Sequence, residues 1–377
     1  MKVKAVFAAL AGVCPLIAMA DINVGVSLAL TGPGASLGIS YKNTFAVMPA
    51  TLGGEKVNYI ILDDGTDPTT AVKNARKLTQ EDKVDLIIGA ATVPTSMAIA
   101  DVAAETKTPQ IALAPMSGMD GKFPWSFSHP QPPALMMKAV AEHMKANGIK
   151  SVGFIGFSDS WGDLALNGFT ASADNMGIKV LTAERYARSD TSVTAQILKL
   201  MTAKPDAILI GASGTPAALP HATLVEKGYK GPIYHTHAVV VKDFLRIGGK
   251  AVEGGMMPAG PVVVADQLPG NSPLKKAGTA FDKAYEAKFG PGTSNSFSAY
   301  TWDAYLLADK AAETALKKKV KPGTPEFRQA VRDALESTKE LVGTHAVYNM
   351  SATNHNGVDS RGAVMIKVDN GTWKLMQ

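Results

Sequence analysis

Three hydroxyl side chains, those of Thr92, Thr95 and Ser96, follow a short apolar run at residues 84–88. The run is apolar on both faces, as in a buried parallel strand, and residues 95–107 are rich in helix formers and lead to a second apolar run. These segments predict a βαβ unit, whose right-handed crossover places the hydroxyls and the helix start at the carboxyl edge of the sheet. Unpaired backbone N–H groups, the helix dipole and the hydroxyls could hold a small anion there, such as a carboxylate.

The same pattern occurs a second time in the chain. Residues 85–94 and 206–216 both read acidic residue, aliphatic strand, Gly-Ala, hydroxyl residue, Pro and helix start. The repeat predicts two similar α/β halves, each with a ligand-facing loop, and the second loop carries Ser213 and Thr215. An accidental likeness is the alternative, because any α/β strand can end in Gly and lead to a helix that starts with Pro.

Aromatic and imidazole side chains also follow predicted strands in the second half. Trp161 follows the strand at residues 151–157, at an edge where an aromatic ring can lie against a flat ligand; the alternative is that it packs only within its own domain. His235 and His237 are two residues apart in a strand predicted at residues 232–237, which places both on one face. They could hydrogen-bond a hydroxyl or a second carboxylate, although at least one of them could be purely structural.

The sequence lacks the motifs of several kinds of catalytic, nucleotide-binding or metal site. The serines in residues 156–160 and 211–214 miss the Gly-x-Ser-x-Gly elbow of α/β hydrolases, so a hydrolase is the least favoured alternative. The glycine-rich turn at residues 31–38 has neither the Lys-Ser/Thr of a P-loop nor dinucleotide spacing. Without an HExxH motif or a matched Cys/His set, we expect no metal and no cofactor.

The N-terminus has the composition of a signal peptide. In residues 1–20, Lys2 and Lys4 precede an apolar tract, and a small-x-small cleavage motif ends at Ala20. The tract is shorter than the ~20 residues that a membrane-spanning helix needs. Cleavage after Ala20 would also remove Cys14, which is the one cysteine, so the mature chain is predicted to lack thiol chemistry.

Composition adds little about partners. The 377-residue chain has a net charge of +5 at pH 7 and is long enough for two domains. The lysine-rich stretch at residues 317–321 lies between two predicted helices, where a solvated helix end is more common than a nucleic-acid site. We therefore expect no nucleic-acid partner.

Strands and helices alternate along most of the chain. In the first half, strands are predicted at residues 22–30, 57–62, 84–88 and 109–114, and helices at 36–51, 68–82 and 95–107. In the second half, strands are predicted at 151–157, 178–181, 206–211 and 232–237, and helices at 161–176, 192–201 and 216–227. Helices at 274–289, 297–319 and 325–337 and a β-rich tail at 345–377 follow, which is consistent with a chain that crosses several times between two domains.

An ordered set of motifs resembles the Leu/Ile/Val-binding branch of the periplasmic solute-binding proteins of ABC importers. The motifs are Gly-Val-Ser-Leu-Ala-Leu-Thr-Gly-Pro at 25–33, Asp-Asp-Gly-Thr-Asp-Pro at 63–68, Ile-Ile-Gly-Ala at 87–90, Asp-Ser-Trp-Gly at 159–162 and Ser-Ala-Tyr-Thr-Trp-Asp-Ala-Tyr at 298–305. The resemblance implies a type I fold, with two doubly wound parallel-sheet domains joined by a three-segment hinge. The first lobe would comprise residues 21–135 and 262–342, and the second 136–261 and 343–377.

The resemblance also implies a function. The protein would be a monomeric periplasmic carrier, not an enzyme, that closes on a small carboxylate-bearing ligand and delivers it to an ABC permease in the inner membrane. A ligand-sensing subunit of a regulator can share this fold and is the alternative of another class. In the family, the first lobe grips the ligand carboxylate through positions that match the loop from Thr92 to Ser96 and the segment at Met116 and Ser117.

Two departures from the amino-acid-binding pattern concern the ligand. Leu37 stands where the family has a tyrosine, and residues 233–239 lack the acid that would neutralise an α-ammonium group. Burying an ammonium group without a counter-charge costs several kcal/mol. With Trp161 and the two histidines opposite and Phe297 at the side, the site is predicted to suit a flat acid such as a hydroxybenzoate or a phenylpropenoate. Branched-chain or other aliphatic amino or keto acids are the alternative.

Overall fold

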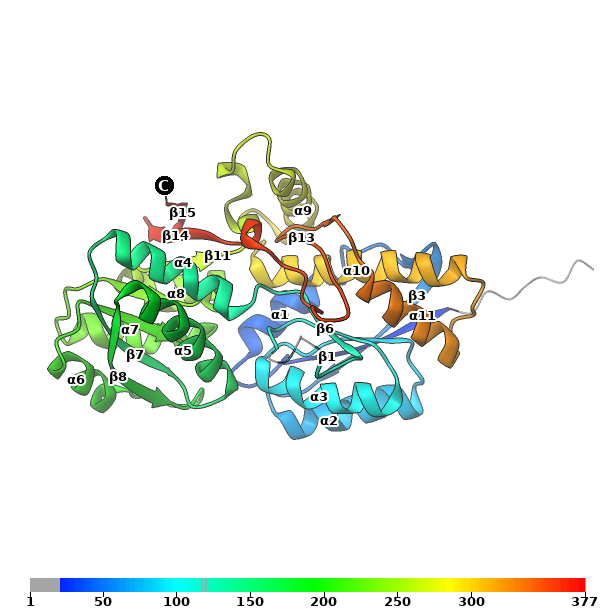
Figure 1. Ribbon diagram of the computed structural model, residues 1–377, viewed down its shortest axis with the longest axis horizontal. Coiled ribbons are helices and arrows are strands. Elements are labelled where there is room, and N and C mark those ends of the chain that lie inside the picture. The colour runs from blue at the N-terminus through cyan, green and yellow to red at the C-terminus, as the bar shows by residue number, and fades with distance from the viewer. Residues whose placement is uncertain (1–20, 117, 119–120, 377) are drawn as a thin grey trace, which may run out of the picture.

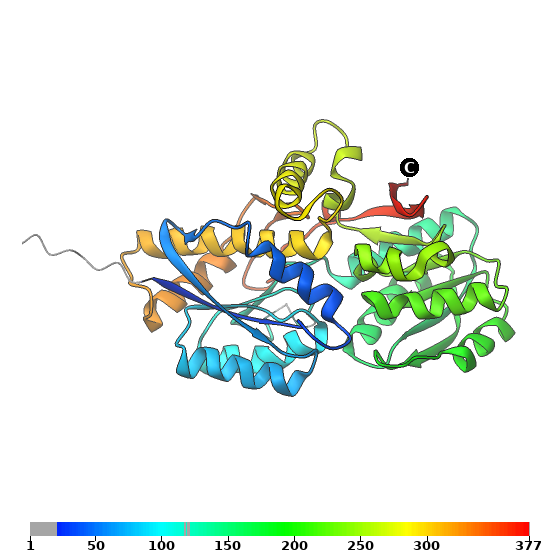
Figure 2. The same cartoon turned by 180° about the vertical axis from the view of Figure 1, so that it is seen from behind.

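The computed structural model describes residues 21–116, 118 and 121–376, which form two α/β lobes side by side (Figures 1 and 2). Each lobe has a central sheet of mostly parallel strands with helices on both faces. The two-lobed α/β architecture predicted from the sequence is therefore confirmed. The predicted signal peptide, residues 1–20, and the predicted ligand residue Ser117 lie outside the described residues.

The first lobe is built on a six-stranded sheet. Its order is β2 (Thr51–Leu52), β3 (Glu55–Asp63), β1 (Ile22–Leu28), β4 (Leu86–Gly89), β5 (Gln110–Ala112) and β6 (Ser126–Ser128). Its helices are α1 (Ala35–Thr44), α2 (Pro68–Arg76, continued by a π-helical turn), α3 (Val93–Thr106), α9 (Pro273–Phe289), α10 (Ser296–Lys317) and α11 (Pro325–Glu336). Helices cover both faces of this sheet because successive side chains of a strand such as β4 point to opposite faces and are all apolar. Leu86 and Ile88 pack in the cluster that includes α1 and α10, whereas Ile87 packs on α2 and α3.

The second lobe is built on a seven-stranded sheet. Its order is β15 (Thr372–Leu375), β14 (Val364–Asp369), β11 (Met256–Ala259), β10 (Ile233–His235), β9 (Ala207–Gly211), β7 (Ser151–Phe157) and β8 (Lys179–Tyr186). Strand β14 is antiparallel to β11, and β15 is antiparallel to β14. Its helices are α4 (Pro133–Ala146), α5 (Ser160–Ala173), α6 (Thr194–Thr202), α7 (Ala218–Glu226) and α8 (Lys242–Gly248). Side chains of β9 alternate: Leu209 packs with α4 and α5, whereas Ile208 and Ile210 pack in the cluster that includes α6, α7 and α8.

The chain passes between the lobes three times. The first connection, residues 129–132, leads from β6 to α4, and the second leads from β11 through Gly260 to a 3-10 turn, Pro261–Gln267. The last connection enters the second sheet at β14. Before that point, β12 (Leu341–Val342) pairs with β13 (Val347–Tyr348), and the ring of His355 stacks on Phe127 of the first lobe at 4.2 Å.

Several predicted element boundaries differ from the structure, and three of these differences have a clear physical reason. The helix predicted at residues 36–51 ends at Thr44, and Pro49 cannot continue a helix because it has no N–H to donate. Strand β8 runs five residues beyond the predicted end at residue 181, because it is an edge strand whose exposed and half-buried residues, some of them charged, hide the pattern of a buried strand. The strand predicted at 232–237 ends at His235, where the Thr236 hydroxyl donates to Ala212 O at 2.7 Å and accepts from the N–H of Ala238.

None of the helices in the described part of the chain combines the length and the hydropathy that crossing a bilayer requires.

Candidate functional site

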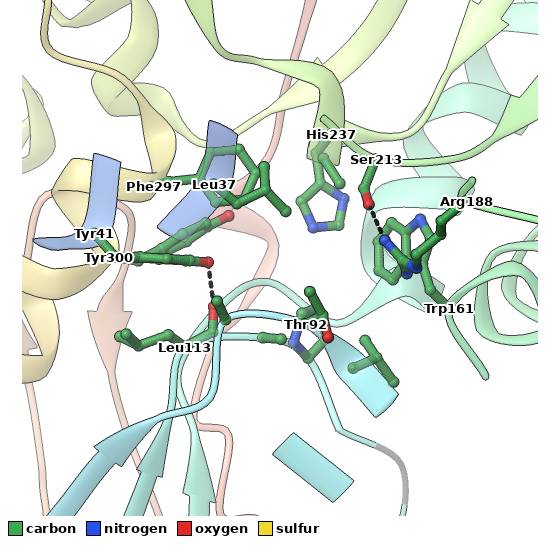
Figure 3. Close-up of a pocket in the computed structure, with 15 residues that line it drawn as sticks. Leu37, Tyr41, Thr92, Leu113, Trp161, Arg188, Ser213, His237, Phe297 and Tyr300 are labelled. Atoms are coloured by element: carbon green, nitrogen blue, oxygen red, sulfur yellow. Dashed lines mark hydrogen bonds between the residues drawn. The ribbon is translucent and has the colours of Figure 1, made fainter. Parts of the chain in front are cut away.

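A cavity lies between the lobes, at the carboxyl ends of the parallel strands; its empty space, including the part open to solvent, is about 350 Å³ (Figure 3). It is lined by Leu37, Tyr41, Ala91, Thr92, Val93, Leu113, Ala114, Pro115, Trp161, Arg188, Ser213, His237, Ala238, Phe297 and Tyr300. Most of these side chains are apolar or aromatic, so the cavity suits a largely apolar ligand with few polar groups.

Helices α1 and α10 supply the aromatic wall of the first lobe. The side chain of Asn295 accepts hydrogen bonds from the N–H groups of Phe297 and Ser298 at 2.9 and 3.1 Å, which fixes the start of α10 at the cavity. The rings of Phe297 and Tyr41 meet edge to face at 5.4 Å. The Tyr41 hydroxyl donates to Leu113 O at 2.5 Å, so this wall is also fastened to the segment after β5.

The hydroxyl loop that precedes α3 contributes one side chain to the cavity. Thr92 lines the cavity, and its Oγ1 lies 2.8 Å from Oγ1 of Thr95. Thr95 and Ser96 are fully buried behind Thr92 and do not line the cavity. The Ser96 hydroxyl donates to Ala90 O at 2.9 Å, so it is used inside the loop. Met116 lies in a separate buried cluster with Phe123.

The second lobe contributes Trp161, Ser213, His237 and Arg188. Trp161 lies in the first turn of α5, whose cap is Asp159: its Oδ1 accepts from the Trp161 N–H at 2.9 Å. Trp161 and His237 meet edge to face, with ring centroids 5.5 Å apart. Thr215, which was predicted beside Ser213, starts a 3-10 turn and does not line the cavity.

Arg188 carries the one charge among the described residues that line the cavity. It follows β8 by two residues; its Nε donates to Asp159 Oδ2 at 2.6 Å and its Nη1 to Ser213 Oγ at 2.9 Å. Its guanidinium group lies over the ring of Phe157, 4.2 Å from the centroid. These contacts hold the guanidinium in one orientation, which favours recognition of a planar anion such as a carboxylate.

The two predicted histidines have different surroundings. His237 lies at the cavity in a 3-10 turn, and burial lowers its pKa to about 3, so it is neutral at neutral pH. His235 lies behind the cavity, where its Nε2 is 2.7 Å from Nδ1 of His221. Burial, and secondarily His221, keep the pKa of His235 well below its usual value. The two side chains do not act as a pair because the strand ends at His235.

Sequence reasoning missed Tyr41, Arg188 and Tyr300. Both tyrosines lie inside predicted helices, and which side of these helices faces the cavity depends on how α1 packs on α10. Arg188 fell in a predicted loop, because the preceding strand was expected to end five residues too early. No group of three or more metal-ligating side chains occurs in the described part of the structure.

Comparison with known proteins identifies the family. A family model for periplasmic binding proteins matches residues 21–372. An extracellular ligand-binding receptor from Rhodopseudomonas palustris HaA2 is 43% identical, with a TM-score of 0.92 over 95% of this chain and all of that chain. A Leu/Ile/Val-binding protein, BraC3, from Rhizobium johnstonii is 25% identical over 338 residues, which cover 86% of each protein.

A more distant structure has the same fold. It is an R. palustris ABC-transporter solute-binding protein in complex with benzoate, with 20% identity and a TM-score of 0.78 over 95% of this chain and 96% of that chain. Leu/Ile/Val-binding proteins are thus among the relatives of this chain, which belongs to the periplasmic binding protein family and has its two-lobed type I fold.

Proposed function

We propose that this protein is the solute-binding component of an ABC importer and that it captures a small flat carboxylic acid, such as a hydroxybenzoate or a phenylpropenoate, between its lobes. The observation that carries the proposal is the charge of the cavity. Among the described residues, the lining contains one cation, Arg188, and no Asp or Glu. A ligand with one negative charge and an apolar body matches such a lining.

An α-amino acid fits this cavity less well. Its ammonium group would need a carboxylate partner, and the nearest candidate, Asp159, already caps α5 with one oxygen and binds Arg188 with the other. Burial of an unpaired ammonium group costs several kcal/mol, and the guanidinium of Arg188 would add repulsion. The likeness to BraC3 keeps branched-chain amino and keto acids as the second candidate.

The polar groups of the cavity suggest how such an acid is held. We place its carboxylate between Arg188 and Ser213 of the second lobe and Thr92 of the first, so that both lobes contact the same group. Its ring would lie against Trp161 and the aromatic wall that includes Phe297.

Two buried polar atoms beside the cavity also lack a hydrogen-bond partner within the described residues. Nε1 of Trp161 and Nδ1 of His237 have no hydrogen bond within the described part of the structure. Unpaired buried polar atoms are costly, and a hydroxyl or carbonyl at the far end of the ligand would satisfy them.

Calorimetric titration tests the proposal. We expect 4-hydroxybenzoate or 4-hydroxycinnamate to bind with a micromolar or lower dissociation constant, and leucine, isoleucine and valine to bind at least a hundredfold more weakly. Tight binding of an aliphatic amino acid with no response to any aromatic acid would overturn the choice of ligand. Tight binding of a branched-chain keto acid alone would support the carboxylate grip but not the aromatic body.

The proposed export also has a direct test. The family is periplasmic, and we propose that residues 1–20 are removed after Ala20 during secretion. N-terminal sequencing of the protein from a periplasmic extract should begin at Asp21. A mature protein that retains Met1 would contradict this assignment.

A further inference from the structure

The connections between the lobes meet in one buried cluster beside the ligand cavity. This hinge cluster comprises Gln131 of the first connection, Gly260 of the second, Gly362 of the third, and Tyr300 and His345 of the first lobe. Nε2 of Gln131 donates to Gly362 O at 2.9 Å and lies 3.2 Å from Nδ1 of His345. A Cβ atom on Gly260 would lie 1.9 Å from Nδ1 of His345 and 2.6 Å from Nε2 of Gln131, so this approach requires glycine.

Tyr300 connects the hinge cluster to the cavity. Its side chain lines the cavity, and its hydroxyl donates to Oε1 of Gln131. Its ring also stacks on the imidazole of His345, with centroids 4.0 Å apart and planes 21° apart. Tyr300 is thus both a wall of the ligand site and a hydrogen-bond donor to the first connection.

His345 is held in one tautomer. Its Nε2 lies 2.9 Å from Ser296 O, a carbonyl that can only accept, so Nε2 carries the proton. Nδ1 is therefore the acceptor for the amide of Gln131. With both ring nitrogens bonded, His345 fixes the orientation of the Gln131 side chain from one side while Tyr300 fixes it from the other.

We propose that Gln131 is a positioning residue that couples occupation of the ligand cavity to closure of the lobes, with the Tyr300 hydroxyl as its link to the cavity. This inference rests on the proposed solute-binding function. Closure about a hinge changes the backbone dihedrals of the connections. Gln131 bonds a first-lobe helix through Tyr300 and the third connection through Gly362, so both bonds can hold in only a narrow range of lobe orientations.

The consequence is a preference of the ligand for the closed form. A ligand that packs on Tyr300 restrains its ring, and the restrained hydroxyl keeps Gln131 in the geometry that the closed connections need. A ligand shifts a conformational equilibrium only through contacts that differ between the two states, and this chain of contacts would supply such a difference.

The experiment uses two tyrosine variants that are matched in chemistry. Tyr300→Phe keeps the ring at the cavity and removes the bond to Gln131. Tyr41→Phe is the control, because Tyr41 also lines the cavity and donates a buried bond, but to Leu113 O within the first lobe. Gln131→Met, of similar length but without polar groups, removes the same link from the other side.

Lobe closure is read as a distance between spin labels at Lys73→Cys on α2 and Ala195→Cys on α6, exposed positions on opposite lobes (Figure 1). Residues 21–377 contain no cysteine, so these labels are unique. Distances are measured without ligand and with 4-hydroxybenzoate.

We expect Tyr300→Phe and Gln131→Met to shift the ligand-free distances toward longer values and to weaken 4-hydroxybenzoate binding by about three- to tenfold, as for a lost hydrogen bond. Tyr41→Phe should leave the ligand-free distances unchanged. The double variant should differ little from either single variant, because both changes remove one link. Distances for Tyr300→Phe that match those for Tyr41→Phe, or strictly additive effects in the double variant, would overturn the coupling.

The ligand-free distances separate this inference from the proposed function. If the wild-type protein binds no aromatic acid, the ligand assignment fails, but the shift in ligand-free distances still reports on Gln131. If the wild-type protein binds the acid and closes while the variants behave as wild type, only the coupling fails.

Discussion

Nε of Arg188 lies 2.6 Å from Oδ2 of Asp159, and this ion pair sets the charge at the ligand cavity. Asp159 is fixed because its other oxygen caps α5. Arg188 is fixed in turn by Asp159, by Ser213 and by the ring of Phe157. The cation is thus presented to the cavity in one orientation, so little side-chain entropy is lost when an anion binds.

Replacement of Arg188 by Met should weaken binding of a carboxylate by about 10- to 100-fold, which is the loss expected for a charge-assisted hydrogen bond. The matched measurement uses benzamide, which has the shape of benzoate but no charge. Calorimetry should show a large loss for benzoate and a small change for benzamide. Equal losses for both ligands would mean that Arg188 acts through the shape of the cavity and not through its charge.

Replacement of Asp159 by Asn should have the opposite effect. Asn still caps a helix, so α5 should keep its start, but the counter-charge of Arg188 is removed. The cavity becomes more positive, and a carboxylate ligand should bind several-fold more tightly. This gain should shrink at 1 M salt. Weaker binding of benzoate by Asp159→Asn, with unchanged thermal stability, would show that the main effect of Asp159 on binding is to hold Arg188 in place.

The hydroxyl loop before α3 provides a prediction with an internal control. Thr92 lines the cavity, so Thr92→Ala should lower the affinity for a carboxylate by about 1–3 kcal/mol. Ser96 donates to Ala90 O inside the loop, so Ser96→Ala should lower stability by about 1 kcal/mol and leave affinity unchanged. Titration and thermal unfolding of both variants check the prediction. Equal affinities for wild type and Thr92→Ala would remove Thr92 from the ligand site.

The elements that could be predicted best from the sequence are buried parallel strands. Strands β4 and β9 are covered on both faces, so their sequences are continuous apolar runs that end in glycine. The edge strand β8 alternates exposed and half-buried residues, including charged ones, so its second half was not recognised. The contact between His355 and Phe127 could not be predicted, because it joins positions more than 200 residues apart and leaves no local pattern.

The same reasoning explains which residues of the site could be predicted from the sequence. Thr92, Trp161 and Ser213 line the cavity and could be predicted because each follows a strand end or starts a helix. Tyr41 and Tyr300 lie within helices, and only the packing of α1 on α10 turns them to the cavity. A charged residue two positions after a parallel strand, as Arg188 is, would have been a usable signal if the end of β8 had been placed correctly.

Buried histidines predict how stability depends on pH. Burial lowers the pKa of His129 from 6.5 to about 4. Between these values the unfolded chain binds a proton that the folded protein does not, so this group makes the folded state less stable as pH falls from about 6.5 to about 4. His129→Gln removes the titration, and its amide can still donate to Tyr300 O, which Nε2 of His129 contacts at 2.8 Å.

Urea unfolding at several pH values measures this effect. The slope of unfolding free energy against pH in this window should be smaller in His129→Gln than in wild type by about 1.4 kcal/mol per pH unit. Above pH 7 the two proteins should have the same slope. Identical slopes between pH 4.5 and 6 would mean that His129 accepts a proton in the folded state.

The last prediction concerns the contact between the lobes at Gly214. Its φ is +61°, and a Cβ atom there would lie 2.9 Å from Oγ of Ser36, which belongs to the other lobe. Gly214→Ala should therefore have two effects: a strain of about 1 kcal/mol from the backbone conformation, and a steric contact that opposes closure. Gly254→Ala supplies the strain alone, because Gly254 has φ +77° and no atom within 4 Å of its Cβ position.

We expect both variants to lower thermal stability, but only Gly214→Ala to lower ligand affinity and to increase the radius of gyration with ligand. Adding Ser36→Gly to Gly214→Ala should restore affinity without restoring stability. Full affinity in Gly214→Ala would contradict closure through this contact, and failure of Ser36→Gly to restore affinity would assign the loss to strain in the loop.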